Sequence, residues 1–334
     1  MVVRALDPKE ECFGAKAILN GCEGFWGEEN VDKQYERQFS PPYFTLNDPE
    51  TGDFVLNSSP DGDAILPSGV GQGGHHSVTG CWNCEIGAGH ISSKKTILVL
   101  GDSHAQQYIN LLSKIGKEHE IRFIESDKLS TCFALDHYTD VDTDGVRDYC
   151  KKMYIYFDGL YGQLDGVIFS TLWGFYYAPE LLESTIASIR THKPDMPFYI
   201  MEDIPWGGAS GGYMCYKRGE YMDTCRVSRE LGYKYPYDMI ETLAERSLVR
   251  DRDYQLVETN QAFCDNAYCY SYIGGITPYF NNATYDVLED NPKKAAFNGG
   301  DASFNPHLSL LYTYSMHDFI AQRFREVGII GGGL

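Results

Sequence analysis

The sequence has neither an excess of basic residues nor a long apolar run. Its 28 lysines and arginines are outnumbered by 47 aspartates and glutamates, which gives a formal net charge of −19. Because nucleic acids and anionic lipids are bound by basic surfaces, this balance argues against both as partners. No segment approaches about 18 uninterrupted apolar residues, so the sequence predicts no transmembrane helix. Internal repeats are also absent.

Cysteine, in contrast, is abundant. The chain has ten cysteines, a number that is unusual for a cytosolic enzyme and ordinary for an exported one. Their order favours four local disulfides, although spacing alone does not fix the connectivity. The favoured pairs are Cys12 with Cys22, Cys132 with Cys150, Cys215 with Cys225, and Cys264 with Cys269.

The two remaining cysteines, Cys81 and Cys84, form a Cys-x-x-Cys motif. This motif is compatible with a redox site or with half of a zinc site, since His75, His76 and His90 lie nearby in the sequence. A zinc site needs two further ligands, and the sequence has no second Cys-x-x-Cys motif. A disulfide-rich chain explains the pair more simply, so we expect no metal.

The most informative segment is a predicted strand, residues 96–100, followed by Gly101, Asp102 and Ser103. A continuous apolar or β-branched run is typical of a strand that is covered on both faces. Glycine permits a sharp turn, and Ser103 then begins a helix whose unpaired N–H groups can hold a developing oxyanion. This arrangement positions a nucleophilic hydroxyl. The alternative is an ordinary serine that caps the helix.

His307 is the second candidate for a catalytic residue. Pro306 precedes it and breaks the chain, so we expect His307 at the start of an amphipathic C-terminal helix. The apolar stripe of that helix consists of Leu308, Leu311, Tyr312, Ser315, Phe319, Ile320 and Phe324. Imidazole has a pKa near neutrality and can accept the proton of a serine. An isolated histidine is more often a surface or capping residue, but its pairing with the serine motif favours a general base.

Strand and helix patterns alternate after residue 94, which predicts an α/β domain with a parallel sheet over residues 94–330. Residues 1–93 are irregular and rich in turn-forming residues, and we expect them to wrap the main domain as a disulfide-pinned extension. The predicted strands are 96–100, 121–124, 166–170, 198–201 and 255–257, and the predicted helices include 179–191 and a segment around 239–244.

Ligands of such sheets bind at the carboxyl ends of the strands. Ser103, Trp173 and Trp206 each follow a predicted strand, so we expect them to converge on one cleft, where the tryptophans stack on a sugar ring. The alternative is that these aromatic residues fill the core or the surface. His104 is adjacent to Ser103, and its side chain should point away from the hydroxyl, so we assign it a supporting role.

The motifs Gly101-Asp102-Ser103-His104-Ala105 and His307-Leu308-Ser309 resemble those of the SGNH/GDSL hydrolase superfamily. The resemblance is strongest to the extracytoplasmic SGNH domain that is fused to acyltransferase family three membrane proteins of bacteria. Phe169-Ser170-Thr171-Leu172-Trp173 resembles the third sequence block of that family, and Cys264 and Cys269 match a common cysteine pair. The resemblance implies a flavodoxin-like three-layer sandwich and O-acylation, usually O-acetylation, of cell-surface glycans or glycolipids, without cofactor or metal.

The sequence departs from this family at the third catalytic position. The family usually has an aspartate three residues before the histidine, where this chain has Phe304. Asp301 is the nearest upstream acid, Asp286 is an alternative if the intervening stretch is an insertion, and a Ser-His dyad is a third possibility. A clear Gly-x-Asn-Asp block is also missing, so the backbone N–H groups of Ser103 and of a nearby glycine, Gly174, would have to bind the oxyanion.

We therefore predict an extracytoplasmic serine O-acyltransferase in which Ser103 is the nucleophile, His307 the base and Asp301 the orienting acid, with Asp102 and His104 behind them. The resemblance implies that a membrane acyltransferase domain delivers the acyl group and that the chain is tethered through a region it does not contain. No signal peptide is visible at Met1, so we expect a mature or excised portion of a longer protein. A carbohydrate esterase and a non-catalytic glycan-binding module are the alternatives.

Overall fold

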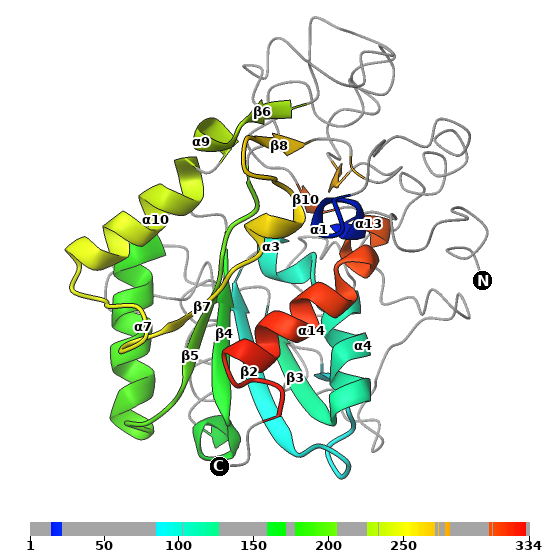
Figure 1. Ribbon diagram of the computed structural model, residues 1–334. Coiled ribbons are helices and arrows are strands. Elements are labelled where there is room, and N and C mark those ends of the chain that lie inside the picture. Colours follow the sequence, from blue (N-terminus) through cyan, green and yellow to red (C-terminus); the bar gives the residue numbers. More distant parts are fainter. Residues whose placement is uncertain are drawn as a thin grey trace, which may run out of the picture.

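A computed structural model describes residues 15–21, 85–101, 103–126, 159–171, 178–205, 226–232, 234–270, 273, 278–280, 307–308 and 310–331. A six-stranded sheet organises this part of the chain (Figure 1), with the strand order β1-β3-β2-β4-β5-β7. All neighbouring strands are parallel except β1, which pairs antiparallel with β3. The strands are β1 (Glu85–Gly87), β2 (Lys95–Gly101), β3 (Ile121–Ser126), β4 (Gly166–Ser170), β5 (Phe198–Met201) and β7 (Gln255–Val257).

The parallel strands follow the flavodoxin-like order. Taken in chain order, β3-β2-β4-β5-β7 reads 2-1-3-4-5, so the direction of winding reverses between β2 and β4. Leu100 of β2 lies opposite Ser126 of β3 and Phe169 of β4, and Gly101 lies opposite Ser170. The three strands therefore end at one carboxyl edge, at the point where ligands of doubly wound sheets bind.

Alternate side chains of β2 enter two separate hydrophobic cores. Ile97 and Val99 belong to one core, whereas Leu98 and Leu100 belong to the other. This alternation follows from the period of two residues along a strand. It explains why the whole segment is apolar, since helices cover both faces of the sheet.

Helices cover the two faces of the sheet as separate layers (Figure 1). The first core is closed by α1 (Ala15–Leu19), α4 (Ile109–His119), α13 (Leu310–Ser315) and α14 (His317–Glu326). The second core is closed by α7 (Ala178–His192) and α10 (Lys234–Glu245). The predicted α/β three-layer architecture is thus confirmed.

Shorter elements connect the layers. They are α3 (Ser103–Gln106), η4 (Tyr161–Gln163), β6 (Arg226–Ser228), α9 (Arg229–Gly232), η5 (Asn260–Ala262), β8 (Tyr268–Tyr270), β9 (Tyr279–Phe280) and β10 (His307–Leu308). Within the described ranges, no helix combines the length and apolar character needed to span a membrane.

The C-terminal helix differs from its prediction. His307 does not begin a helix but lies in β10, which pairs antiparallel with β9 and is therefore extended. The apolar stripe is divided between α13 and α14, which are separated at Met316. Its face is nevertheless buried: Leu308, Tyr312, Ser315, Phe319, Ile320 and Phe324 are all at most 8% exposed. The period of the stripe therefore predicted the burial but not the break.

Two short segments of the N-terminal region are held by the main domain. The backbone N–H of Ala15 donates to Oγ of Ser315 at 3.0 Å, and Nζ of Lys16 lies 3.1 Å from a carboxylate oxygen of Asp318. The strand β1, which the sequence did not predict, extends the sheet at its edge. The division at residues 93 and 94 remains a prediction, because the rest of 1–93 lies outside the described residues.

The disulfide between Cys264 and Cys269 is present, as predicted. It joins the turn after η5 to β8, and in the same turn the N–H of Asp265 donates to the carbonyl of Tyr268 at 2.9 Å. The other cysteines lie outside the described residues, and so do His75 and His76.

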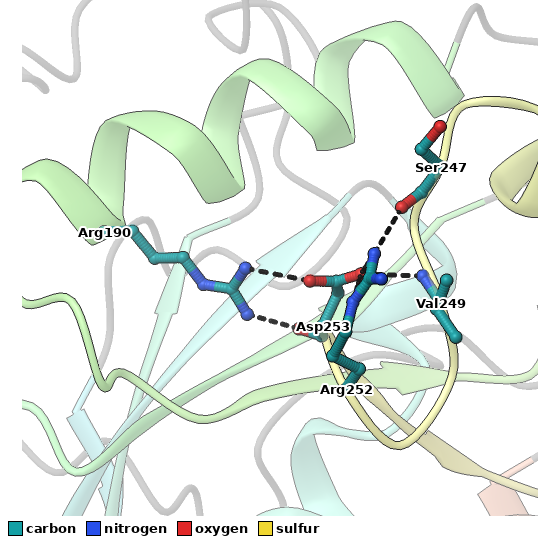
Figure 2. A network of polar contacts seen from close by, with 5 residues as sticks. All are labelled: Arg190, Ser247, Val249, Arg252 and Asp253. Atoms are coloured by element: carbon teal, nitrogen blue, oxygen red, sulfur yellow. Dashed lines mark hydrogen bonds and ion pairs between the residues drawn. The ribbon is translucent and has the colours of Figure 1, made fainter.

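A polar network surrounds Asp253 at the amino end of β7, the end away from the carboxyl edge of the sheet (Figure 2). The carboxylate of Asp253 accepts hydrogen bonds from the backbone N–H of Val249 at 2.8 Å, from Arg252 at 2.7 Å and from Arg190 at 3.3 Å. Burial acts to raise the pKa of Asp253, but these hydrogen bonds outweigh it and hold the pKa below its usual range. The network ties α7 to the loop before β7, far along the sheet from its carboxyl edge.

Candidate active site

The segment of Ser103 is fixed by the close approach of β2, β4 and α3. β2 ends at Gly101, and α3 begins at Ser103. A Cβ atom on Gly101 would lie only 1.7 Å from the carbonyl oxygen of Ser170 and 2.8 Å from Cβ of Ala105. The φ angle of Gly101 is not positive, so glycine is required here by lack of space rather than by a left-handed turn. Ser103 thus lies two residues after the carboxyl end of β2.

The next residue, His104, is bonded to two neighbouring strands. Its side chain is 1% exposed, and its Nδ1 lies 3.0 Å from Oδ1 of Asp203, which follows β5. The hydroxyl of Ser170, the last residue of β4, donates to the carbonyl of His104 at 3.2 Å. The turn that carries Ser103 is thus tied to the ends of both β4 and β5.

The end of β5 is in turn joined to the end of β7 by a buried acid. Oε2 of Glu202 accepts hydrogen bonds from the backbone N–H groups of Thr259 at 2.9 Å and of Asn260 at 3.0 Å. Burial raises the pKa of Glu202, and these backbone hydrogen bonds only partly offset the rise. Asp203 also accepts the N–H of Ile204 at 2.9 Å. Through these hydrogen bonds, both acids stabilise the carboxyl edge of the sheet.

Tyr108, just before α4, is a further buried polar side chain close to Asp203. Its side chain is 1% exposed. Burial, and after it the negative charge of Asp203, raise the pKa of Tyr108 far above that of a free tyrosine. The phenol therefore stays neutral and is not suited to be a base at neutral pH.

The segment of His307 meets the segment of Ser103 through Gln107. The backbone N–H of Leu308 donates to Oε1 of Gln107 at 2.9 Å, a buried contact between residues 201 positions apart. Gln107 follows α3 directly, and Leu308 follows His307 in β10. The structure thus places the two candidate catalytic segments side by side, as their assignment to one site requires.

Several predicted site residues lie outside the described residues. They are Asp102, Trp173, Gly174, Trp206, Asp286 and Asp301. For Ser103 and His307 the structure describes the backbone position. The proposed triad, the oxyanion donors and the sugar-stacking tryptophans therefore remain predictions.

Two residues that support the site were not identified from the sequence. Asp203 had a signal, since an acidic pair, Glu202 and Asp203, follows a predicted strand at the edge where ligands bind. Gln107 had none, because a glutamine beside an apolar stripe reads as a solvent-exposed helix position, yet it is only 5% exposed.

The described residues offer no cluster of three or more histidine, cysteine, aspartate or glutamate side chains suited to a metal. His90, which lies near Cys81 and Cys84 in the sequence, contacts Nη1 of Arg122.

A search of curated proteins finds no match. Among solved structures, the periplasmic domain of a lipopolysaccharide acetyltransferase from Salmonella ser. Paratyphi A superposes with a TM-score of 0.44 and 14% identity, covering 71% of this chain and 85% of that one. The family description "SGNH domain (fused to AT3 domains)" matches residues 71–283, a span that contains Ser103 and Asp203 and ends before Asp301 and His307. The chain therefore belongs to the family of SGNH domains that are fused to AT3 domains.

Proposed function

We propose that this chain is a serine-dependent O-acyltransferase that works outside the cytoplasm, with Ser103 as its nucleophile and His307 as its base. The observation that carries the proposal is the hydrogen bond between Gln107 and Leu308, which joins the segment after Ser103 to the segment of His307 at the carboxyl edge of the sheet. Membership in the SGNH family supports the same chemistry.

The reaction proceeds in two acyl transfers. The hydroxyl of Ser103 attacks an acyl ester or thioester while His307 accepts its proton, and the leaving alcohol or thiol departs with that proton. A sugar hydroxyl then attacks the acyl-enzyme, His307 accepts the proton of the sugar, and the proton returns to Ser103. The backbone N–H groups of Ser103 and Gly174 hold the oxyanion in both steps.

An acid orients His307 in this proposal. Asp301 is the first candidate and Asp286 the second, and a Ser-His dyad needs neither. His104 is not assigned as the base, because its side chain is only 1% exposed and is closed to a substrate. His104 and Asp102 instead support the turn of Ser103 without touching the reacting atoms. Trp173 and Trp206 stack on the acceptor sugar.

The acceptor is a glycan or glycolipid of the cell envelope, and a fused or partner AT3 domain delivers the acyl group and tethers the chain to the membrane. The net charge of −19 argues against nucleic acid as a ligand. Water as the second acceptor would make the same site a carbohydrate esterase, since the acyl-enzyme is shared and only the acceptor differs.

One sequence feature favours a second candidate function. Phe304 occupies the position of the usual family aspartate, as expected for a non-catalytic module that binds a glycan and presents it to the AT3 domain. Such a module would keep the fold and the sugar-binding tryptophans while its serine stays unreactive.

A fluorophosphonate probe and p-nitrophenyl acetate separate the two functions. We expect the probe to label Ser103, and we expect Ser103→Ala and His307→Ala each to lower ester turnover by about a thousandfold or more. Ser92→Ala and His192→Gln, at exposed positions outside the site, are the matched controls. An unlabelled serine together with retained sugar binding would establish the glycan-binding module.

A further inference from the structure

We infer that Gln107 is a positioning residue for His307: its side-chain carbonyl holds the strand of the base against the turn of the nucleophile. This inference rests on the proposed function and adds a residue to it. Gln107 touches neither the reacting atoms nor a substrate in this proposal. It acts through the backbone N–H of Leu308, which lies 2.9 Å from its Oε1.

The contact has a defined polarity. A backbone N–H only donates, so the oxygen of the Gln107 amide faces Leu308 and its NH₂ group points elsewhere. Both groups are buried, since Gln107 is 5% exposed and Leu308 is 3% exposed. Without Gln107, the N–H of Leu308 would be buried and unpaired unless the strand moved.

The strand of His307 has few other supports among the described residues. Among the residues that the structure describes, β10 is two residues long and pairs with β9, in the register His307 opposite Phe280 and Leu308 opposite Tyr279. A two-stranded ribbon of this length is not stable by itself. In the described part of the chain, the burial of Leu308 and the bond to Gln107 hold β10 against the rest of the domain.

Gln107 is itself placed by the same turn that carries Ser103. It lies four residues after Ser103, between α3 and α4, where the N–H of Tyr108 donates to the carbonyl of Ala105 at 3.1 Å. The preceding His104 is bonded to Asp203 and Ser170. Ser103 and Gln107 thus lie on one hydrogen-bonded turn, and the bond from Leu308 to Gln107 links that turn to the segment of His307.

Gln107→Met tests this role, because methionine has a similar length and no strong acceptor. We expect kcat for p-nitrophenyl acetate to fall about 10- to 100-fold while KM changes little, since a displacement of the base by about 1 Å impairs proton transfer rather than binding. Gln107→Glu keeps an acceptor oxygen and should recover most of kcat. Ser315→Ala, which removes another buried side-chain acceptor from a distant backbone N–H, is the matched control and should leave kcat unchanged.

Hydrogen exchange gives a second readout that does not depend on turnover. The peptide that contains Leu308 should exchange faster in Gln107→Met than in the wild type, whereas Ser315→Ala should leave it unchanged. If Gln107→Met does not fold, the shorter Gln107→Asn takes its place in both measurements.

The outcomes separate this inference from the proposed function. Full kcat in Gln107→Met, with Ser103→Ala and His307→Ala inactive, overturns the positioning role of Gln107 and leaves the enzyme assignment intact. An equal loss of kcat in Gln107→Met and Ser315→Ala also overturns it, because the effect would then be structural. Wild-type turnover in Ser103→Ala and His307→Ala overturns the proposed function itself.

Discussion

Nδ1 of His104 lies 3.0 Å from Oδ1 of Asp203, and the two side chains are only 1% and 3% exposed. The contact joins the residue that follows Ser103 to the end of β5, two strands away from β2 in the sheet. Because a carboxylate only accepts, Nδ1 carries the hydrogen. This buried contact holds the turn that carries Ser103 against the end of β5.

Asp203→Ala should therefore lower both stability and activity. It leaves the N–H groups of His104 and Ile204 buried without their acceptor, so we expect the free energy of unfolding in urea to fall by about 3 kcal/mol. The turnover of p-nitrophenyl acetate should fall as well, because the turn of Ser103 loses its brace.

Asp253→Ala is the matched control, since it removes a partly buried, hydrogen-bonded aspartate at the opposite end of the sheet (Figure 2). It should also lower the free energy of unfolding but leave turnover per folded molecule unchanged. Equal turnover in the two variants would show that the contact of His104 with Asp203 has no part in catalysis.

Gly101→Ala should be among the most damaging single substitutions in the sheet. The added methyl group would lie 1.7 Å from the carbonyl oxygen of Ser170, a backbone atom that cannot move without separating β2 from β4. We expect a loss of about 3 kcal/mol in the free energy of unfolding, at the upper end of the usual cost of overpacking. Urea denaturation followed by circular dichroism measures it.

Gly162→Ala is the control for Gly101→Ala, because a Cβ at Gly162 meets no atom within 4 Å. It should change stability by no more than about 0.5 kcal/mol. If the two variants are equally stable, the strands are more loosely paired at Gly101 than the structure indicates.

The sheet was predictable from the sequence because its strands are short apolar runs bounded by polar or turn residues. The predicted strands at 166–170, 198–201 and 255–257 coincide with β4, β5 and β7. β1 was missed, since three residues, Glu85–Gly87, are too few to establish a period. β1 is a strand because it pairs with β3, and the local sequence pattern holds no information about this pairing.

The candidate site was predictable only in part. Ser103 and His307 were predicted because each stands in a motif of several residues, and their catalytic roles stay predictions. The bond between Gln107 and Leu308 places their segments together. Gln107 and Asp203 were missed because their partners are remote in the sequence, and a partner 201 residues away leaves no trace in local composition. His307 was assigned to a helix because Pro306 marks a boundary without showing that a strand comes first.

The disulfide between Cys264 and Cys269 should contribute modestly to stability. It closes a loop with a sequence separation of only 5, so loop entropy accounts for about 2 kcal/mol. The same turn is also held by backbone hydrogen bonds from Asp265 to Tyr268 and from Tyr270 to Phe263. The double variant Cys264→Ala/Cys269→Ala should therefore fold, lose about 2 kcal/mol in urea denaturation and keep its turnover. A failure to fold would show that the bridge is needed to form the turn.

Glu202 should make stability fall as the pH rises. Burial raises its pKa in the folded chain above the ordinary value of 4.5, so the folded state binds the proton more tightly than the unfolded state does. Stability from this group is then fully present below about pH 4.5 and is lost as the pH rises through the raised pKa. Glu202→Gln keeps an oxygen for the N–H groups of Thr259 and Asn260 and removes the ionisation.

We therefore expect Glu202→Gln to gain stability relative to the wild type as the pH rises, by at most about 1.4 kcal/mol per pH unit. Urea denaturation at a series of pH values from about 4 to 8 measures the difference. Glu241→Gln, at an exposed position of α10, is the matched control for the loss of one negative charge. If the wild type instead gains on Glu202→Gln with rising pH, the backbone hydrogen bonds to the carboxylate outweigh its burial, and the sign of the pKa shift is reversed.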